Sequence, residues 1–265
     1  MKVLDRIVET KRREVAQAKS RLPMDTLVAL TSPSDAPHRF SKALSGGEGP
    51  HIIAEVKRAS PSAGLIRGHG LADDWDPAEL AQAYARGGAR CLSVLTDIQF
   101  FWGHPDALHQ CSEASGLPAL RKDFVLEPYQ IYESRWLGAD AVLLIARILD
   151  RETLVRCAQI AQELAMDVLV EIHHERELDA ALACEGAMIG VNHRDLDTLQ
   201  IDLDLSIRLR DRIPEERIAI AESGVSDRTQ IERLMEHGYS RFLIGEYLAR
   251  QPVPESALRV LRGTR

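Results

Sequence analysis

The stretch HIIAEVKRASPSAG, residues 51–64, decides the fold of this chain. Its β-branched residues predict a buried strand that runs into a polar, turn-rich loop. Because successive side chains of a strand point to opposite faces, Ile53, Glu55 and Lys57 share one face of that strand. Glu55 and Lys57 therefore place opposite charges on a face that should be internal. A structural ion pair is one explanation, and a functional site at the carboxyl end of the strand is the other.

The composition indicates a globular protein with a full hydrophobic core, since 45% of the 265 residues are apolar. Its cysteines form no CxxC pair, so we expect buried thiols in a reducing compartment: Cys91, Cys111, Cys157 and Cys184. No apolar run is long enough to span a bilayer and no signal peptide is evident, so we expect a cytoplasmic protein without a membrane partner. The net charge of −7 argues against a nucleic-acid partner.

Residues 1 to about 48 predict a helical extension that packs on the main domain, because their apolar content is too thin for a separate core. Over residues 2–20, an amphipathic helix is predicted from the spacing of Leu4, Ile7, Val8, Lys11 and Val15. Short helical segments are predicted near 25–31 and 39–45. The basic cluster KRR at 11–13 lies beside glutamates, and we interpret it as a solvated face.

From residue 51 onward, short β-branched or leucine-rich runs alternate with helical patterns. Capping signals agree with this alternation, since Asp76, Glu127 and Asp150 each precede a helical pattern. Eight parallel strands joined by helical crossovers can close into a ring, so we predict a single (β/α)8 TIM barrel domain over residues 1–265. A doubly wound open sheet is the alternative, but no GxGxxG follows the first strand. The predicted strands are 52–57, 91–96, 118–122, 141–145, 168–172, 188–192, 218–222 and 241–245.

Polar side chains recur at the ends of these strands, where the sites of such barrels lie. Five strands that each offer a charge or an amide to one mouth favour catalysis over a single structural ion pair. The residues are Glu55, Lys57, Lys122, Asp123, Glu171, Asn192, Arg194, Glu222 and Ser223.

Mixed lysines and glutamates suit proton transfer. We expect a site lysine to have a pKa lowered toward neutrality, and a glutamate in an apolar pocket to have a raised pKa. His173 and His174 are adjacent on an extended chain and point to opposite sides, so we expect no metal site.

The last two units carry a glycine after each strand, in AESG at 221–224 and LIGE at 243–246. This is the recurrent phosphate site of the fold, in which backbone N–H groups and a helix N-terminus hold the dianion. Aromatic and aliphatic residues near the same mouth are either plain core or a slot for a flat ring: Phe100, Phe101, Phe124, Leu143 and Ile145.

Six ordered motifs closely resemble the indole-3-glycerol phosphate synthase family. They are IIAEVKRASPSAGLI, LSVLTDIQFFWG, LRKDFVLEPYQIYESRWLGADAVLLI, LVEIHHEREL, IGVNHRDLDTLQIDL and AESGVSDRTQI. The resemblance implies a carboxy-lyase of tryptophan biosynthesis. It would convert 1-(2-carboxyphenylamino)-1-deoxyribulose 5-phosphate to indole-3-glycerol phosphate, carbon dioxide and water, without cofactor or metal. We expect a monomer that can work beside other enzymes of the pathway.

The resemblance also implies roles for particular residues. Lys122 would be the general acid of ring closure, and Glu171 a base or a proton shuttle for the dehydration. Lys57 would contact the substrate carboxylate and help either the ring closure or the final proton transfer, with Glu55 setting its charge and position. The remaining catalytic and binding residues implied are Asn192, Arg194, Glu222 and Ser223 in the polar ring, and Ser60, Gly224, Gly245 and Glu246 around the phosphate. If the apolar slot forms, we expect Phe101, Phe124 and Leu143 to bind the substrate there.

The chain departs from the family pattern at Ala63, at His193, at Glu246 and in WGHP at 102–105. Its first loop, RGHGLADDWDP, is longer than usual, and we expect it to cover the mouth. Two other functions compete. A phosphoribosylanthranilate isomerase would be expected to have a cysteine base near the end of the first strand, and a catalytically silent sugar-phosphate-binding barrel would be expected to lose some of these residues.

Overall fold

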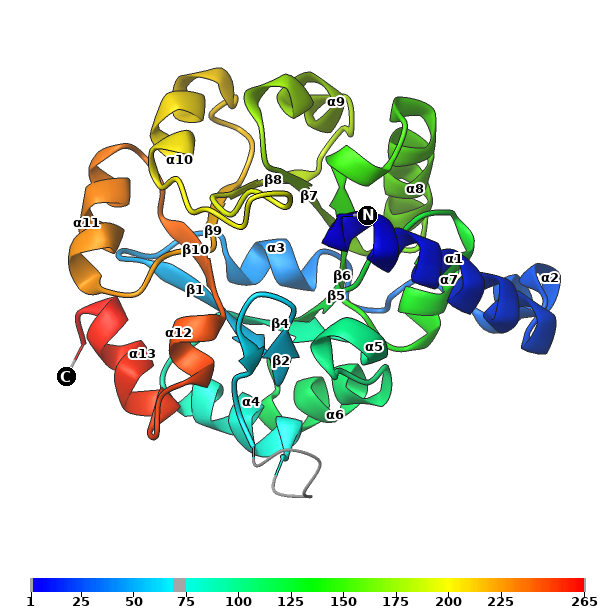
Figure 1. Ribbon diagram of the computed structural model, residues 1–265, viewed down its shortest axis with the longest axis horizontal. Helices are drawn as coiled ribbons and strands as arrows, with labels where there is room; N and C mark the ends of the chain where they lie inside the picture. The colour runs from blue at the N-terminus through cyan, green and yellow to red at the C-terminus, as the bar shows by residue number, and fades with distance from the viewer. Residues whose placement is uncertain (1, 69–74, 265) are drawn as a thin grey trace.

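The computed structural model describes residues 2–68 and 75–264 (Figure 1). Within them, eight parallel strands form a closed barrel in the order β1-β10-β9-β8-β7-β6-β5-β4. Because β1 pairs with both β10 and β4, the ring is closed, and the doubly wound open sheet is wrong. The barrel strands are β1 (His51–Val56), β4 (Cys91–Leu95), β5 (Ala119–Lys122), β6 (Ala141–Ile145), β7 (Asp167–Ile172), β8 (Met188–Asn192), β9 (Ala219–Glu222) and β10 (Arg241–Ile244).

The two faces of each strand serve two separate cores. Ile53 packs inside the barrel with Leu120, Leu169 and Ile220. Ile52 and its alternate neighbours belong to the larger core between the strands and the outer helices. Period-2 alternation therefore holds, and Glu55 lies on the inward face as predicted.

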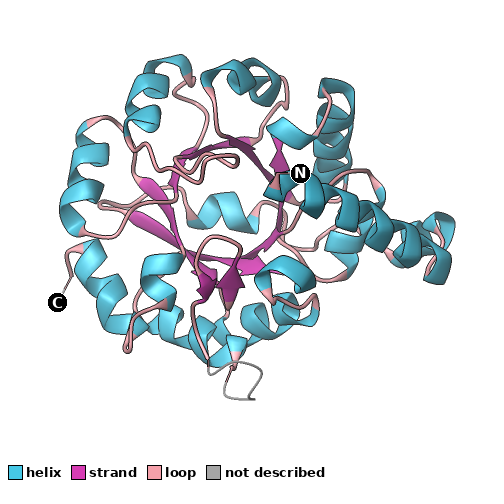
Figure 2. Ribbon diagram, viewed as in Figure 1, coloured by secondary structure: helices cyan, strands magenta, loops and turns pink. Residues whose placement is uncertain are grey.

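The outer helices surround the ring (Figure 2). Asp76 accepts hydrogen bonds from the backbone N–H groups of Ala78 and Glu79, and Asp150 accepts one from Thr153, so both aspartates cap their helices. A helix also follows Glu127, but it begins at Tyr129 after Pro128 and has no side-chain cap. The α-helices that follow the strands are α4 (Pro77–Arg86), α5 (Ile98–Phe101), α6 (Asp106–Ser115), α7 (Tyr129–Trp136), α8 (Arg151–Glu163), α9 (Leu178–Leu182), α10 (Asp204–Leu209), α11 (Arg228–Glu236), α12 (Glu246–Ala249) and α13 (Pro254–Arg262). Short 3-10 helices are η1 (Ala146–Ile148), η2 (Glu175–Glu177) and η3 (Arg210–Arg212).

The N-terminal helices are α1 (Val3–Arg21), α2 (Met24–Leu30) and α3 (Arg39–Ala43), close to the predicted segments. Leu4 and Ile7 of α1 pack onto the core inside the barrel, and so does Phe40 of α3. The amide of Ser41 donates to Asp167 at the start of β7, so α3 closes the amino-terminal end of the barrel. The extension thus contacts both ends of the ring, since α3 closes the amino-terminal end and α1 crosses one edge of the carboxyl-terminal end (Figure 1).

Lys11 corrects one interpretation of the sequence. Arg12 and Arg13 are exposed, as a solvated face requires, but Lys11 is buried. Its ammonium lies 3.1 Å from Asp97 and 2.8 Å from Asp123. A buried lysine is tolerated because two carboxylates at the ends of β4 and β5 neutralise it.

The loop after β1 contains a short antiparallel hairpin that the sequence did not predict, β2 (Ala59–Ser60) with β3 (Gly64–Leu65). The expectation that the long first loop covers the mouth concerns residues 69–74, which lie outside the described residues. The four cysteines are buried free thiols, as predicted. In the described ranges, no helix has both the length and the apolar character needed to cross a bilayer.

Candidate active site

A cavity of about 480 Å³ opens at the carboxyl ends of the strands. It is lined by all the residues expected to be catalytic or substrate-binding: Glu55, Lys57, Ser60, Phe101, Lys122, Phe124, Leu143, Glu171, Asn192, Arg194, Glu222, Ser223, Gly224, Gly245 and Glu246. Asp123 and Ile145 line it too, whereas Phe100 does not. These residues come from six of the eight strands, β1, β5, β6, β7, β8 and β9, and from the segments that follow the strands, including those after β4 and β10. The volume suits a small-molecule ligand.

Lys122 lies at the centre of the polar part of the cavity. Its Nζ is 2.5 Å from Oε2 of Glu171 and 2.9 Å from Oε2 of Glu222, so one ammonium bridges two carboxyl groups from β7 and β9. Both carboxyl groups are buried, whereas 13% of the Lys122 side chain remains accessible. A ligand can therefore reach the ammonium while the carboxyl groups stay behind it.

The pKa values of Lys122, Glu171 and Glu222 differ from one another, and that of Lys122 differs from the lowered value expected from the sequence. Burial alone would lower the pKa of Lys122, but Glu171, Glu222 and Glu55 raise it above its usual value, so the expected lowering is wrong. Burial raises the pKa of Glu222 to about 8, and the charge of Glu171 adds to the effect. Burial would raise the pKa of Glu171 too, but Lys122 and His173 hold it well below its usual range. The raised carboxyl pKa thus belongs to Glu222.

A second ion pair lies beside the first. Lys57 and Glu55 contact each other through Nζ and Oε1, as their shared strand face predicted. Glu55 is held from the other side by Gly245, where a Cβ would lie 2.2 Å from the same carboxylate oxygen. This close approach explains why a glycine follows β10 at this point.

One wall of the cavity is apolar. The rings of Phe101 and Phe124 are 5.9 Å apart and tilted by 38°, and Leu143 lies on β6 nearby. Leu4 and Ile7 of α1 complete the lining, a contribution that the sequence reasoning missed. Their helical spacing identified a buried stripe but could not show which surface that stripe would cover. The wall is a flat apolar surface that fits an aromatic ring.

The opposite end of the cavity is built from turns. Ser223 and Gly224 both have positive φ, +65° and +78°, and Gly245 caps the short helix α12. Ser60 and the start of α12 line the same end, which is the position of the predicted phosphate site.

Glu246 lies at this end but is neutralised. Arg194 contacts its Oε2 at 3.5 Å, and Arg250 contacts its Oε1 at 3.1 Å. The sequence reasoning missed Arg250, although its position four residues after Glu246 on a helix is a recognisable signal. A guanidinium that lines this end of the cavity favours an anion.

His193, a departure from the family pattern, has a structural explanation. Its Nδ1–H donates to the carbonyl oxygen of Ser223 at 2.7 Å, and its Nε2 accepts from the Ser206 hydroxyl at 2.6 Å. Burial lowers the pKa of His193, which keeps the ring neutral and suited to this pair of contacts. The side chain thereby fixes the turn at Ser223.

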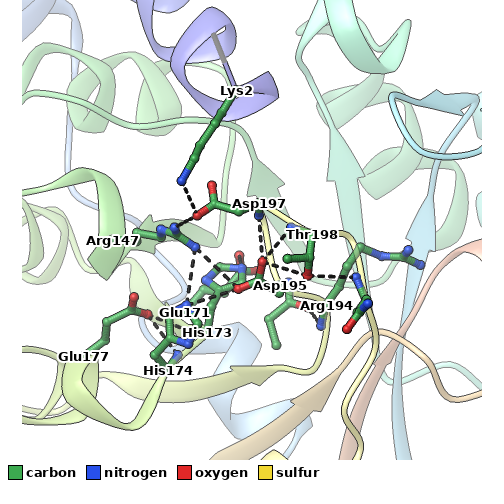
Figure 3. Close-up of polar contacts among 12 residues, drawn as sticks. Lys2, Arg147, Glu171, His173, His174, Glu177, Arg194, Asp195, Asp197 and Thr198 are labelled. Carbon is green, nitrogen blue, oxygen red and sulfur yellow. Dashed lines mark hydrogen bonds and ion pairs between the residues drawn. The ribbon is translucent and has the colours of Figure 1, made fainter.

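The loop after β8 is tied down by a network of charges (Figure 3). Arg147 contacts Asp197 and lies 3.8 Å from Asp195, and Lys2, which precedes α1, contacts Asp197 at 2.9 Å. This loop carries Arg194 into the cavity, so the network positions that guanidinium. Among the side chains that the structure describes, no group of three or more His, Cys, Asp or Glu residues is arranged to hold a metal ion.

The chain is similar to known proteins over almost its whole length. Residues 4–261 match the family model "Indole-3-glycerol phosphate synthase". An indole-3-glycerol phosphate synthase of Legionella pneumophila (strain Paris) is 46% identical over 259 residues, covering 98% of each chain. One of Rhodospirillum rubrum is 43% identical over 265 residues, covering 98% of this chain and 99% of that relative.

Solved structures support the barrel fold. The 3-hexulose-6-phosphate synthase of Salmonella typhimurium superposes with a TM-score of 0.62 at 12% identity, covering 80% of this chain and 97% of that one. The thiamine phosphate pyrophosphorylase of Pyrococcus furiosus gives 0.57 at 13% identity, with coverage of 81% and 94%. At such identities the likeness concerns the fold alone. The family match and the relatives show that this chain belongs to the indole-3-glycerol phosphate synthase family.

Proposed function

We propose that the mouth of the barrel converts 1-(2-carboxyphenylamino)-1-deoxyribulose 5-phosphate to indole-3-glycerol phosphate by acid–base catalysis, with Lys122 at its centre. The observation that carries this assignment is the bridging of Glu171 and Glu222 by the Lys122 ammonium at the base of the cavity. A proton donor and two acceptors of different proton affinity are thus within one hydrogen-bonded group.

Ring closure forms a bond between the carboxyl-bearing ring carbon and the ketone carbon of the substrate. Lys122 protonates the ketone oxygen as that bond forms, and Glu222, 2.9 Å away, resupplies the proton. Carbon dioxide then leaves and its bonding electrons restore the aromatic ring. In the dehydration, the new hydroxyl leaves as water with a proton from Lys122, while Glu171 accepts the proton that the ring system loses.

The other residues hold the substrate in near-attack geometry. Lys57 contacts the substrate carboxylate, and Glu55 fixes the direction of its ammonium. Asn192 and Ser223 contact hydroxyl groups and Arg194 contacts an anionic group. The aromatic ring lies against Phe101, Phe124 and Leu143, and the phosphate lies at the turns formed by Ser60, Gly224, Gly245 and the Glu246 amide.

Two other functions are not favoured. The isomerase would be expected to have a cysteine base at the mouth, whereas none of the four cysteines lines the described cavity. A silent sugar-phosphate-binding barrel would not need the Lys122–Glu171–Glu222 group, which is complete.

The test is to follow indole absorbance when purified protein meets the carboxyphenylamino-deoxyribulose phosphate in the presence of excess chelator. We expect absorbance to grow at a rate proportional to protein concentration, with or without chelator. A flat trace from folded protein would contradict the proposal and favour the silent barrel. Growth that chelator abolishes would instead contradict catalysis by the side chains alone.

We also propose that the chain acts as one domain, as a monomer in the cytoplasm, and that it can work beside other enzymes of tryptophan biosynthesis. The packing of α1 and α3 against the inner core of the barrel supports the single domain. Light scattering on the eluted protein should give the mass of one chain, and a dimer mass would contradict the monomer.

A further inference from the structure

His173 is a buried histidine whose ring has one polar neighbour. It follows Glu171 by two positions, so both side chains point to the same side of the chain. Its Nε2 lies 3.2 Å from Oε1 of Glu171, and its side chain has no solvent exposure (Figure 3). Nδ1 has no hydrogen-bond partner among the groups that the structure describes, and the polar contact of Nε2 is the one with Glu171, which is close but not aligned as a hydrogen bond.

Such a position is unfavourable for a purely structural histidine. Burying a polar nitrogen without a hydrogen-bond partner costs free energy, and an apolar side chain of similar volume would avoid that cost. His193 shows the contrast, because it is equally buried and both of its nitrogens are satisfied. The imidazole of His173 is therefore explained by its contact with Glu171.

The contact makes two otherwise similar carboxyl groups unequal. Glu171 and Glu222 both contact Lys122 through Oε2. The second oxygen of Glu171 faces His173, whereas the second oxygen of Glu222 is buried without a hydrogen-bond partner among the described residues. When two carboxyl groups share one cation, the group with the additional N–H donor carries the negative charge.

We propose that His173 is a positioning residue that decides which carboxyl group is ionised: its Nε2–H holds Glu171 as the carboxylate and leaves the proton of the pair on Glu222. This inference rests on the proposed function, in which Glu171 accepts a proton and Glu222 resupplies Lys122. The contact requires only an N–H group at Nε2, which an imidazole can supply.

The other charged groups near His173 contact its backbone, its neighbour in the chain or the far side of Glu171, and not its ring. Oε2 of Glu177 from η2 accepts the backbone N–H of His173 at 2.7 Å and so holds the chain rather than the ring. Arg147 from η1 and Asp195 from the loop after β8 contact the neighbouring His174 instead. Lys122 and Glu222 meet the far side of the Glu171 carboxylate.

The kinetic test compares His173→Leu, His173→Gln and the control His51→Leu in the dependence of kcat on pH. His173→Leu should lower kcat about tenfold at neutral pH, keep KM within about twofold, and move the acid limb up by about one pH unit. His173→Gln, whose amide N–H reaches the same oxygen, should restore most of the loss. His51 is equally buried at the other end of the barrel, so His51→Leu should lower the melting temperature without moving the pH profile.

A second measurement is independent of turnover. Titration of ¹³C-labelled glutamate carboxyl groups by NMR, assigned with Glu171→Gln and Glu222→Gln, should show Glu222 protonating first as pH falls. In His173→Leu that order should be lost. An unchanged order, or equal losses of kcat in the Leu and Gln variants without a shifted profile, would overturn the proposal. A wild-type enzyme that fails to turn over the substrate but loses the order in His173→Leu would overturn only the proposed function.

Discussion

The ammonium of Lys11 lies 2.8 Å from Oδ1 of Asp123, which joins the N-terminal helix to the end of β5. The same oxygen accepts the backbone N–H of Phe124. Lys11 also contacts Asp97, whose other oxygen accepts the backbone N–H of Phe100 at the start of α5. The N-terminal helix thereby fixes both segments that carry the aromatic wall.

Lys11→Met should reduce the free energy of unfolding by about 3–5 kcal/mol, because it removes the cation beside the buried Asp97 and leaves Asp123 with Arg121 alone. Burial would raise the pKa of Asp123, but Lys11 and Arg121 hold it below its usual range. The loss of stability in Lys11→Met should therefore be largest at pH values above the ordinary pKa of an aspartate. Urea unfolding measures the change. The control is Lys19→Met on the same helix, a partly exposed pair with Glu127 that should change stability by less than about 1 kcal/mol. Equal effects of the two variants would contradict a structural role for Lys11.

Lys122→Met should lower kcat by at least about a hundredfold, because the proton donor next to the ketone is lost. The methionine keeps the length of the side chain, so the near-UV circular dichroism should stay that of a folded barrel. Lys42→Met on the exposed side of α3 is the control and should leave kcat unchanged. Retention of more than about a tenth of the activity would remove Lys122 from the acid role.

The barrel and the polar mouth could be predicted from the sequence because both depend on local periodicity. Alternation along one strand places Glu55 and Lys57 on the same face, and the carboxyl ends of parallel strands meet at one end of the ring. Residues such as Lys122 and Glu222, a hundred positions apart, were thus expected at one mouth and do lie 2.9 Å apart.

The parts that could not be predicted depend on which surfaces meet. The spacing of Lys11 shows a helical stripe but not the two carboxylates that neutralise it. The pKa of Lys122 could not be predicted either, because burial alone would lower it whereas three neighbouring glutamates raise it. Pairings between distant segments decide the sign of such effects, and no local pattern records them.

The stability of the protein should depend on pH through Glu222. Burial raises the pKa of Glu222 to about 8, above an ordinary value of about 4.3. Between these values the folded state holds a proton that the unfolded state has released, so this contribution is complete below about 4.3 and is lost as pH rises through about 8. Glu222→Gln does not titrate, so its stability relative to the wild type should increase with pH in this window, by up to about 1.4 kcal/mol per pH unit.

Urea unfolding of the wild type and of Glu222→Gln, between about pH 4.3 and about pH 8, measures this difference in stability. The contribution of Glu171 to stability depends on pH in the opposite direction, because its pKa is held low. That contribution is lost only as pH falls below about 4.3. Glu216→Gln, at an exposed site, is the control and should stay parallel to the wild type at every pH. A constant difference between Glu222→Gln and the wild type would show that Glu222 is ionised throughout.

Gly224→Val should raise KM by about tenfold or more and change kcat less, because it disturbs the turn at the predicted phosphate end of the cavity. Gly224 has φ +78°, and an added Cβ would lie 2.4 Å from Ile201 in the loop after β8. The matched control is Gly116→Val at the end of α6, where φ is +70° but an added Cβ meets nothing within 4 Å. Both variants carry the same backbone strain, so a KM that rises only in Gly224→Val locates the anion at this turn. If KM is unchanged in both while both melt at lower temperature, the phosphate is held elsewhere in the cavity, with Arg250 as the next residue to test.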